Sequence, residues 1–129
     1  MSIIFCLQVR RMIYQNNLVT VEIEPSEIPW IKVFTQRPVK EFSECSADEK
    51  LEIFRVIDVA EKLMLSYFQP DKINIASFGN ILPQVHWHVM ARFATDSYFP
   101  EPMWGEQQRQ AQLNLPSFEI FFKQLGESL

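Results

Sequence analysis

The sequence predicts an α+β fold with an antiparallel sheet, organised as one domain over residues 1–129. Three observations support this class: two adjacent segments with strand-like alternation, one long helix with a capping motif, and strands and helices that are partly segregated along the chain. A doubly wound fold would alternate strand and helix strictly. At 129 residues the chain is also too short for two ordinary domains.

The first two predicted strands form a hairpin. LVTVEIE (18–24) is rich in β-branched residues and alternates with period 2, which predicts a half-buried strand with Val19, Val21 and Ile23 on one face. PSEIP (25–29) is typical of a turn, and WIKVFTQ (30–36) then predicts the second strand.

The clearest helix begins after Ser46. Ser46 and Glu49 form an S-x-x-E capping box, in which each side chain satisfies a free backbone amide of the first turn. Pro70 is expected to end the element. Apolar residues that recur at helical spacing should face the sheet: Ile53, Val56, Ile57, Ala60, Leu63, Met64 and Tyr67.

Two further strands are predicted, at KINIAS (72–77) and QVHWHVMAR (84–92). The turn FGNILP (78–83) joins them, and we expect Gly79 to supply a positive φ or a close backbone approach at its bend. Arg92, at the end of the last strand, is expected to be solvated.

The chain closes with a proline-rich loop, SYFPEPMWG (97–105), and an amphipathic helix, SFEIFFKQL (117–125). Ser117 is the expected N-cap. The helix aromatics are assigned to the core or to a dimer surface: Phe118, Phe121 and Phe122.

Composition limits the possible partners. The net charge of −4 argues against a broad basic surface for duplex nucleic acid, although a small basic pocket for phosphate is still compatible with it. Arg10 and Arg11 are interpreted as surface charge, and Cys6 and Cys45 as reduced thiols. The first residues fit neither a secretory signal nor a membrane span, so we expect a soluble cytoplasmic protein with no membrane partner.

The only two histidines of the chain, His86 and His88, lie two residues apart in the last predicted strand. Side chains at i and i+2 share a face, so the imidazoles should project together from Cα atoms about 6–7 Å apart. Alternation divides the segment into one face with Gln84, His86, His88 and Met90, and a second, buried face with Val85, Trp87 and Val89.

Three interpretations of this pair are open from the residues alone. Both histidines can be structural, hydrogen-bonded at the sheet surface. His86 and His88 can also be two ligands of a metal site, whose remaining ligands would be carboxylates or cysteine. Finally, one neutral imidazole can attack phosphorus while the other donates to phosphoryl oxygens, with the amides of the preceding turn holding the anion.

The stretch NIASFGNILPQVHWHVMARF (74–93) resembles the histidine triad superfamily of nucleotide hydrolases and transferases. The family signature is His-φ-His-φ-His-φ-φ, with φ hydrophobic, and residues 84–90 match six of its seven positions. Pro29-Trp30 at the start of a strand and the FPEPMWG loop look like a bacterial branch related to diadenosine polyphosphate hydrolases. The resemblance extends from about residue 18 to residue 105.

The resemblance implies a five-stranded antiparallel sheet with two helices, usually paired as a homodimer. It implies that His86 is the nucleophile, forming a nucleotidyl-histidine intermediate at the α-phosphate of substrates such as dinucleoside polyphosphates or nucleoside phosphoramidates. His88 would contact the phosphate and the leaving group. No metal or other cofactor is expected. Phosphate or nucleotide contacts are expected from the preceding strand and turn: Asn74, Gly79 and Asn80.

Two positions depart from the family pattern. Gln84 replaces the first histidine of the triad; it can form hydrogen bonds but cannot carry a proton. Glu24 replaces an asparagine expected near the nucleotide, and a carboxylate there would repel a phosphate. These departures leave a second hypothesis open, a non-catalytic nucleotide-binding protein on the same fold. Trp104 lies in a loop that in the family reaches the site, although packing the loop down is the simpler role.

Overall fold

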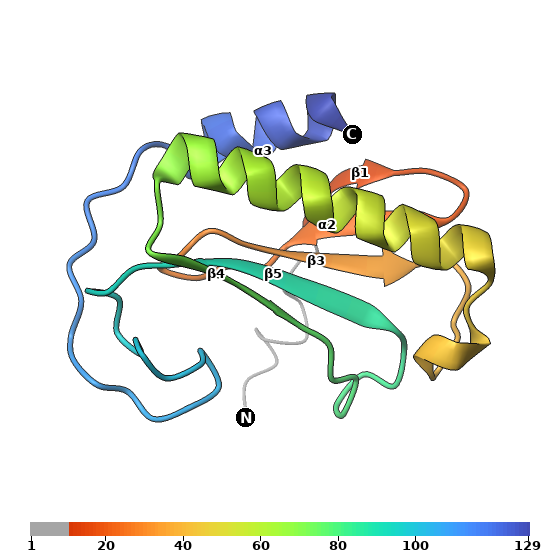
Figure 1. The fold of residues 1–129 in the computed structure, drawn as a ribbon, viewed down its shortest axis with the longest axis horizontal. Coiled ribbons are helices and arrows are strands. Elements are labelled where there is room, and N and C mark those ends of the chain that lie inside the picture. The colour runs from red at the N-terminus through yellow and green to blue at the C-terminus, as the bar shows by residue number, and fades with distance from the viewer. Residues whose placement is uncertain (1–10) are drawn as a thin grey trace.

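The computed structural model describes residues 11–129 and shows a five-stranded antiparallel sheet with two α-helices, which confirms the predicted fold class. The strand order is β1-β2-β3-β5-β4. Both helices lie on one side of the sheet, and the segment after β5 passes along the other side before it reaches α3 (Figure 1). The elements are β1 (Arg11–Gln15), β2 (Val19–Ile23), β3 (Trp30–Thr35), the 3-10 helix η1 (Phe42–Glu44), α2 (Ala47–Phe68), β4 (Lys72–Ala76), β5 (His86–Arg92) and α3 (Phe118–Ser128).

The four strands predicted from the residues are all present, and β1 is the strand that their pattern did not predict. Its sequence, RMIYQ, has polar ends, and its register with β2 shifts between Met12 and Tyr14. A strand with such an irregularity does not show clean alternation, because the residues on either side of the shift change faces.

α2 begins as its capping box predicts. Ser46 Oγ accepts from Glu49 N at 3.0 Å, and Ser46 N donates to Glu49 Oε1 at 2.7 Å. Glu49 is also bound by Arg37, which lies just after β3, through contacts of 2.9 and 2.6 Å. This guanidinium, together with the cap, lowers the pKa of the buried Glu49 carboxyl to about 2. The helix ends at Phe68, and Gln69 adopts a left-handed conformation immediately before Pro70.

The main core lies between the sheet and the two helices. Strand register places Val21, Val33 and Trp87 on the side of the sheet that faces α2. Most of the predicted apolar stripe of α2 packs there, including the fully buried Ile53 and Met64. The opposite side of the sheet therefore carries the alternate residues of the same strands, including both histidines.

α3 is capped by Ser117 as predicted and extends to Ser128, three residues beyond the expected end. The helix contains Gly126, where a Cβ atom would lie 2.7 Å from the carbonyl oxygen of Ile13 in β1. A glycine thus permits the helix to continue against the edge strand. Phe121 and Phe122 are buried in the core.

Several smaller expectations can also be compared with the structure. Cys45 is a free, buried cysteine, whereas Cys6 and Arg10 lie outside the described residues. Arg11 is exposed and pairs with Glu119 of α3, in agreement with its assignment as surface charge. Within residues 11–129, no helix combines the length and the apolar character that crossing a bilayer requires.

Candidate functional site

The site lies where β3 and β5 pair at the middle of the sheet. Antiparallel register places Phe34 opposite His86 and Lys32 opposite His88. Paired residues project from the same side of a sheet, so these four side chains share the side turned away from α2. Two adjacent strands therefore bring a cation, an aromatic ring and two imidazoles together.

The two imidazoles lie close to each other and are largely buried. Their ring centroids are 5.1 Å apart, and the residues are 8% (His86) and 7% (His88) exposed. The sequence correctly predicted that they share a face. It did not predict that this face is covered as fully as the Val/Trp/Val face, because the covering segment follows β5 in the chain and is irregular.

Hydrogen bonding determines which nitrogen of His86 is free. Nδ1 of His86 lies 2.7 Å from the backbone carbonyl oxygen of Gln84. A carbonyl oxygen can only accept, so Nδ1 must carry the proton, and Nε2 of the neutral ring then presents a lone pair. Phe34 stacks on the imidazole at 4.9 Å with an interplanar angle of 18°, which holds the plane of the ring.

His88 adopts the opposite tautomer. Its Nδ1 accepts a hydrogen bond from Nε1–H of Trp30 at 2.9 Å, so the proton of the neutral ring is on Nε2. Burial lowers the pKa of His88 to about 4, with further lowering by His86 and by Lys32. In their neutral forms the two imidazoles thus present an acceptor at Nε2 of His86 and a donor at Nε2 of His88.

Gln84 precedes β5 and serves the site through its backbone. Its side-chain amide donates to the carbonyl oxygen of Thr35 at 2.8 Å, at the end of β3. Its side chain does not line the cavity that contains the histidines. The carbonyl oxygen of Gln84, rather than its side chain, orients His86.

The histidines open into a cavity of about 390 Å³. Of the predicted phosphate-binding residues, Gly79 and Asn80 line it, and Gly79 has the expected positive φ, +68°. The rest of the lining mixes one cation with apolar side chains: Lys32, Phe34, Phe78, Ile81, Leu82 and Trp104.

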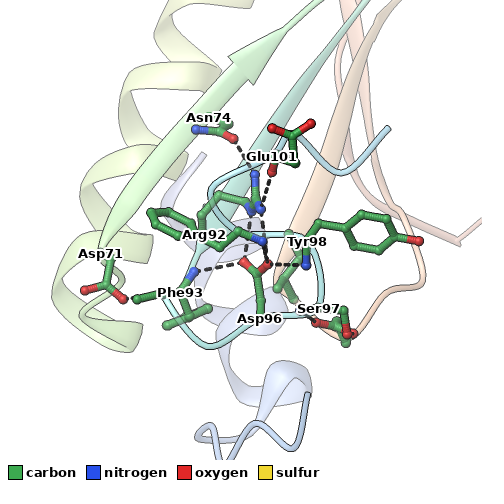
Figure 2. A network of polar contacts seen from close by, with 12 residues as sticks. Asp71, Asn74, Arg92, Phe93, Asp96, Ser97, Tyr98 and Glu101 are labelled. Carbon is green, nitrogen blue, oxygen red and sulfur yellow. Dashed lines mark hydrogen bonds and ion pairs between the residues drawn. The ribbon is translucent and has the colours of Figure 1, made fainter. Parts of the chain in front are cut away.

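Asn74 lies outside this cavity, in a buried network around Arg92 (Figure 2). Arg92 Nη1 donates to Asn74 Oδ1 at 2.8 Å, and its other nitrogens pair with Asp96 at 2.9 and 3.1 Å. The expectation that Arg92 is solvated was wrong: it is 1% exposed, and Asp96 is fully buried. Strand periodicity could not indicate that Arg92 is buried, because its acidic partner, Asp96, lies in the irregular segment after β5.

The network holds the loop that covers the histidines. Asp96 accepts from the backbone amides of Phe93, Tyr98 and Phe99, and Arg92 also donates to the carbonyl oxygen of Glu101 (Figure 2). Arg92 and Asp96 thus each form hydrogen bonds to further groups besides their ion pair. These bonds fix the start of the loop against β4 and β5.

Trp104, at the end of this loop, packs against the sheet and also lines the cavity. Its ring contacts His88 at 4.8 Å, Trp30 at 5.3 Å and Phe78 at 4.8 Å between centroids, so it packs the loop down. It also lines the cavity and is 47% exposed. Trp104 therefore packs against the sheet on one side and leaves part of its ring accessible from the cavity.

Sequence reasoning missed Lys32, Phe34 and the partner role of Trp30. The alternation of WIKVFT contained the signal, because it places a lone lysine between Trp30 and Phe34 on one face of β3. Glu24, which the family pattern places near the nucleotide, contacts a residue that lines the cavity. Its carboxylate forms an ion pair of 2.7 Å with Lys32 and does not line the cavity.

Within the described part of the chain, no three His, Cys, Asp or Glu side chains are grouped closely enough to hold a metal ion. The third and fourth ligands that the His-x-His interpretation requires are therefore not supplied by residues 11–129.

Comparison with known proteins identifies the family. Residues 8–95, more than half of the chain, match the HIT domain family. The fold is similar to that of a histidine triad protein from Bradyrhizobium japonicum, with 24% identity, coverage of 99% of this chain and 95% of the other, and a TM-score of 0.75. A histidine triad protein from Marinobacter aquaeolei gives 23% identity, coverage of 93% and 90%, and a TM-score of 0.76.

A more distant similarity is to a hypothetical histidine triad nucleotide-binding protein from Sulfolobus tokodaii, at 14% identity, coverage of 98% and 88%, and a TM-score of 0.63. A search of curated proteins gives no significant match. The family match covers both histidines and the turn before them. We conclude that the chain belongs to the HIT domain family.

Proposed function

We propose that this protein binds nucleotides and hydrolyses or transfers a nucleoside monophosphate group through His86. The observation that supports this most strongly is the complementary protonation of the two imidazoles. The Gln84 carbonyl requires Nδ1–H on His86, and the Trp30 indole requires Nε2–H on His88. A ring nitrogen with a free lone pair and a ring N–H donor therefore belong to neighbouring imidazoles that line one cavity, which supports a nucleophilic role for His86.

The proposed chemistry has two steps. In the first, Nε2 of His86 attacks the α-phosphorus, an N–P bond forms, and the bond from phosphorus to the leaving group breaks with its electron pair on the leaving group. In the second, water attacks the same phosphorus and loses a proton to solvent, the N–P bond breaks with its electron pair returning to Nε2 of His86, and the nucleoside monophosphate is released. His88 Nε2–H donates to the leaving group in the first step or to a phosphoryl oxygen in both steps, and stabilises the charge that develops there.

The substrate class that fits is one with an activated α-phosphate, such as a dinucleoside polyphosphate or a nucleoside phosphoramidate. The apolar part of the lining suits a base or an apolar leaving group, and the turn at Gly79 and Asn80 offers polar groups to the phosphate. The name of the Sulfolobus tokodaii protein, nucleotide-binding, is in keeping with this class.

A non-catalytic nucleotide-binding protein is the second candidate. The observation in its favour is that Gln84 stands where the family has the first histidine and uses its side chain to bind the Thr35 carbonyl. On this alternative the cavity binds nucleotide without turnover.

A cleavage assay separates the two candidates. Dinucleoside polyphosphates and nucleoside phosphoramidates are incubated with the wild type and with His86→Ala, with chelator present, and release of nucleoside monophosphate is measured. We expect release that resists chelator and falls by roughly 10³-fold or more in the variant, because the nucleophile is gone. Gln84→Ala serves as the matched control. Nucleotide binding by the wild type without cleavage would support the binding protein instead.

We also propose that the protein forms a homodimer. β4 is the terminal strand of the sheet, and one side of it has no neighbouring strand among residues 11–129. Ile75 on this strand is 43% exposed. An open edge with an exposed apolar residue favours association. Light scattering after gel filtration tests the proposal, and a monomer at every concentration up to the millimolar range would contradict it.

A further inference from the structure

Lys32 is a cation that the imidazole chemistry leaves unused. It lies opposite His88 in the β3–β5 register and lines the same cavity. Lys32 is the lysine or arginine among the residues that line this cavity, and the pKa of His88 is lowered to about 4, so His88 adds no positive charge near pH 7. A phosphate chain that reaches His86 thus has one side chain of fixed opposite charge within the cavity wall.

The ammonium group of Lys32 is held at the side of the cavity by Glu24. The two groups are 2.7 Å apart, and the exposed fractions of their side chains are 22% for Lys32 and 33% for Glu24. The backbone of Glu24 is fixed, because its amide donates to the carbonyl oxygen of Trp30 at 3.0 Å. The Lys32 Nζ also lies 5.7 Å from the centre of the Phe34 ring, the ring that stacks on His86.

This arrangement leaves donor capacity for a ligand. An ammonium group has three N–H donors, and one contact to a carboxylate uses one of them. Lys32 can therefore donate to a phosphate oxygen while it keeps Glu24. Glu22 lies opposite Lys32 on β2, so a second carboxylate is near this flank of the cavity, and Lys32 is the lining side chain there whose charge favours an anion.

We propose that Lys32 is the residue that binds the phosphate chain of the substrate, and that Glu24 holds its ammonium group in place and moderates its affinity. The inference rests on the proposed function, because it assigns one part of the same site. It also gives Glu24 a role at a position where a bare carboxylate would repel phosphate: the charge of Glu24 is already matched by Lys32.

The test uses inorganic tripolyphosphate, which carries the anionic chain without a nucleoside. Binding to the full-length protein is measured by titration calorimetry for the wild type, Lys32→Met and Lys32→Arg. Methionine keeps the apolar stem and removes the charge, while arginine keeps the charge. Lys62→Met is the matched control, since Lys62 forms an exposed ion pair with Asp58 on α2, on the other side of the sheet.

We expect Lys32→Met to weaken tripolyphosphate binding roughly tenfold or more, as for loss of a charge-assisted contact, and Lys32→Arg to retain most of it. Glu24→Gln should strengthen binding by roughly two- to fivefold, because it frees the ammonium group at the cost of one partly exposed ion pair. Lys62→Met and Asp58→Asn should leave binding unchanged. Thermal unfolding of each variant establishes that it is folded.

The outcomes separate this inference from the proposed function. Absence of tripolyphosphate binding by the wild type, or equal losses in Lys32→Met and Lys62→Met, would overturn the role of Lys32. Binding of tripolyphosphate that depends on Lys32, in a protein that neither binds nor cleaves nucleotides, would support the role of Lys32 and overturn the proposed function. Cleavage through His86 with undiminished tripolyphosphate binding in Lys32→Met would support the proposed function and overturn the role of Lys32.

Discussion

Trp30 and His88, 58 residues apart in the chain, are joined by a hydrogen bond of 2.9 Å from the indole N–H to Nδ1 of the imidazole. The bond crosses the central pair of strands and fixes the tautomer of a buried histidine. His86 is fixed in the opposite tautomer by a carbonyl only two residues away. One imidazole is therefore oriented by tertiary structure and the other by its own segment, which makes their responses to substitution different.

Substitution of Trp30 by Phe should disturb His88 selectively. Phenylalanine keeps an aromatic ring but removes the donor, so the buried Nδ1 loses its partner at a cost of about 1–3 kcal/mol in unfolding free energy. We expect ¹⁵N NMR of the His88 ring to change from the Nε2–H form to a mixture of tautomers, and kcat/KM to fall roughly tenfold. Trp104→Phe is the control, since Trp104 contacts the same imidazole through its ring. An unchanged ¹⁵N spectrum in Trp30→Phe would contradict the assignment.

The lowered pKa of His88 predicts a specific dependence of stability on pH. Its pKa is about 4 in the folded protein against an ordinary value of 6.5. Between these values the unfolded chain binds more protons than the folded one, so the free energy of unfolding falls as the pH falls. The contribution of His88 to stability is therefore complete above about pH 6.5 and is lost as the pH falls toward 4. Urea unfolding between pH 5 and 7.5 should show this slope in the wild type and a smaller one in His88→Gln.

The interval above pH 5 is chosen because carboxylates titrate below it. The pKa of Glu49 is about 2 instead of 4.5, so its contribution to stability is lost only as the pH falls from about 4.5 toward 2. Direct NMR titration of the His88 ring gives a second measure. A midpoint near 6.5 would show that the imidazole is not desolvated as its burial indicates.

Gln84 should tolerate substitution better than its position in the motif implies. Its contribution to His86 is a backbone carbonyl, which every residue supplies. Gln84→Ala removes the hydrogen bond to Thr35, at a cost of about 1 kcal/mol in stability, and should change kcat/KM by less than about threefold. Gln84→His, which completes the family signature, should not raise kcat/KM. A large gain in that variant would show that the first imidazole is missing from the chemistry.

Asp96 should be critical for the loop that carries Trp104. Asp96→Asn leaves the buried Arg92 without its counter-charge, and we expect a loss of about 3–5 kcal/mol in unfolding free energy. The backbone amides of Tyr98 and Phe99 donate hydrogen bonds to Asp96, so their hydrogen exchange should accelerate first. Asp58→Asn, in the exposed pair with Lys62, is the matched control and should cost less than about 1 kcal/mol.

Much of the secondary structure could be predicted because its signals are local. The capping box at Ser46, the cap at Ser117 and the positive φ of Gly79 each depend on a few consecutive residues, and each is present in the structure. β1 was missed because the shift in its register interrupts the alternation. Gly126 was not assigned a role because the carbonyl that excludes a side chain belongs to Ile13, more than a hundred residues away.

The sequence by itself determined the fold class, the pairing of the two histidines on one face of a strand, and the family resemblance that the HIT domain match confirms. Tertiary structure decided which nitrogen of each imidazole is free, that Arg92 is buried against Asp96, and that Lys32, in the cavity lining, pairs with Glu24. The physical reason is that periodicity reports the face on which a side chain lies, whereas protonation and ion pairing depend on partners brought from other strands and loops.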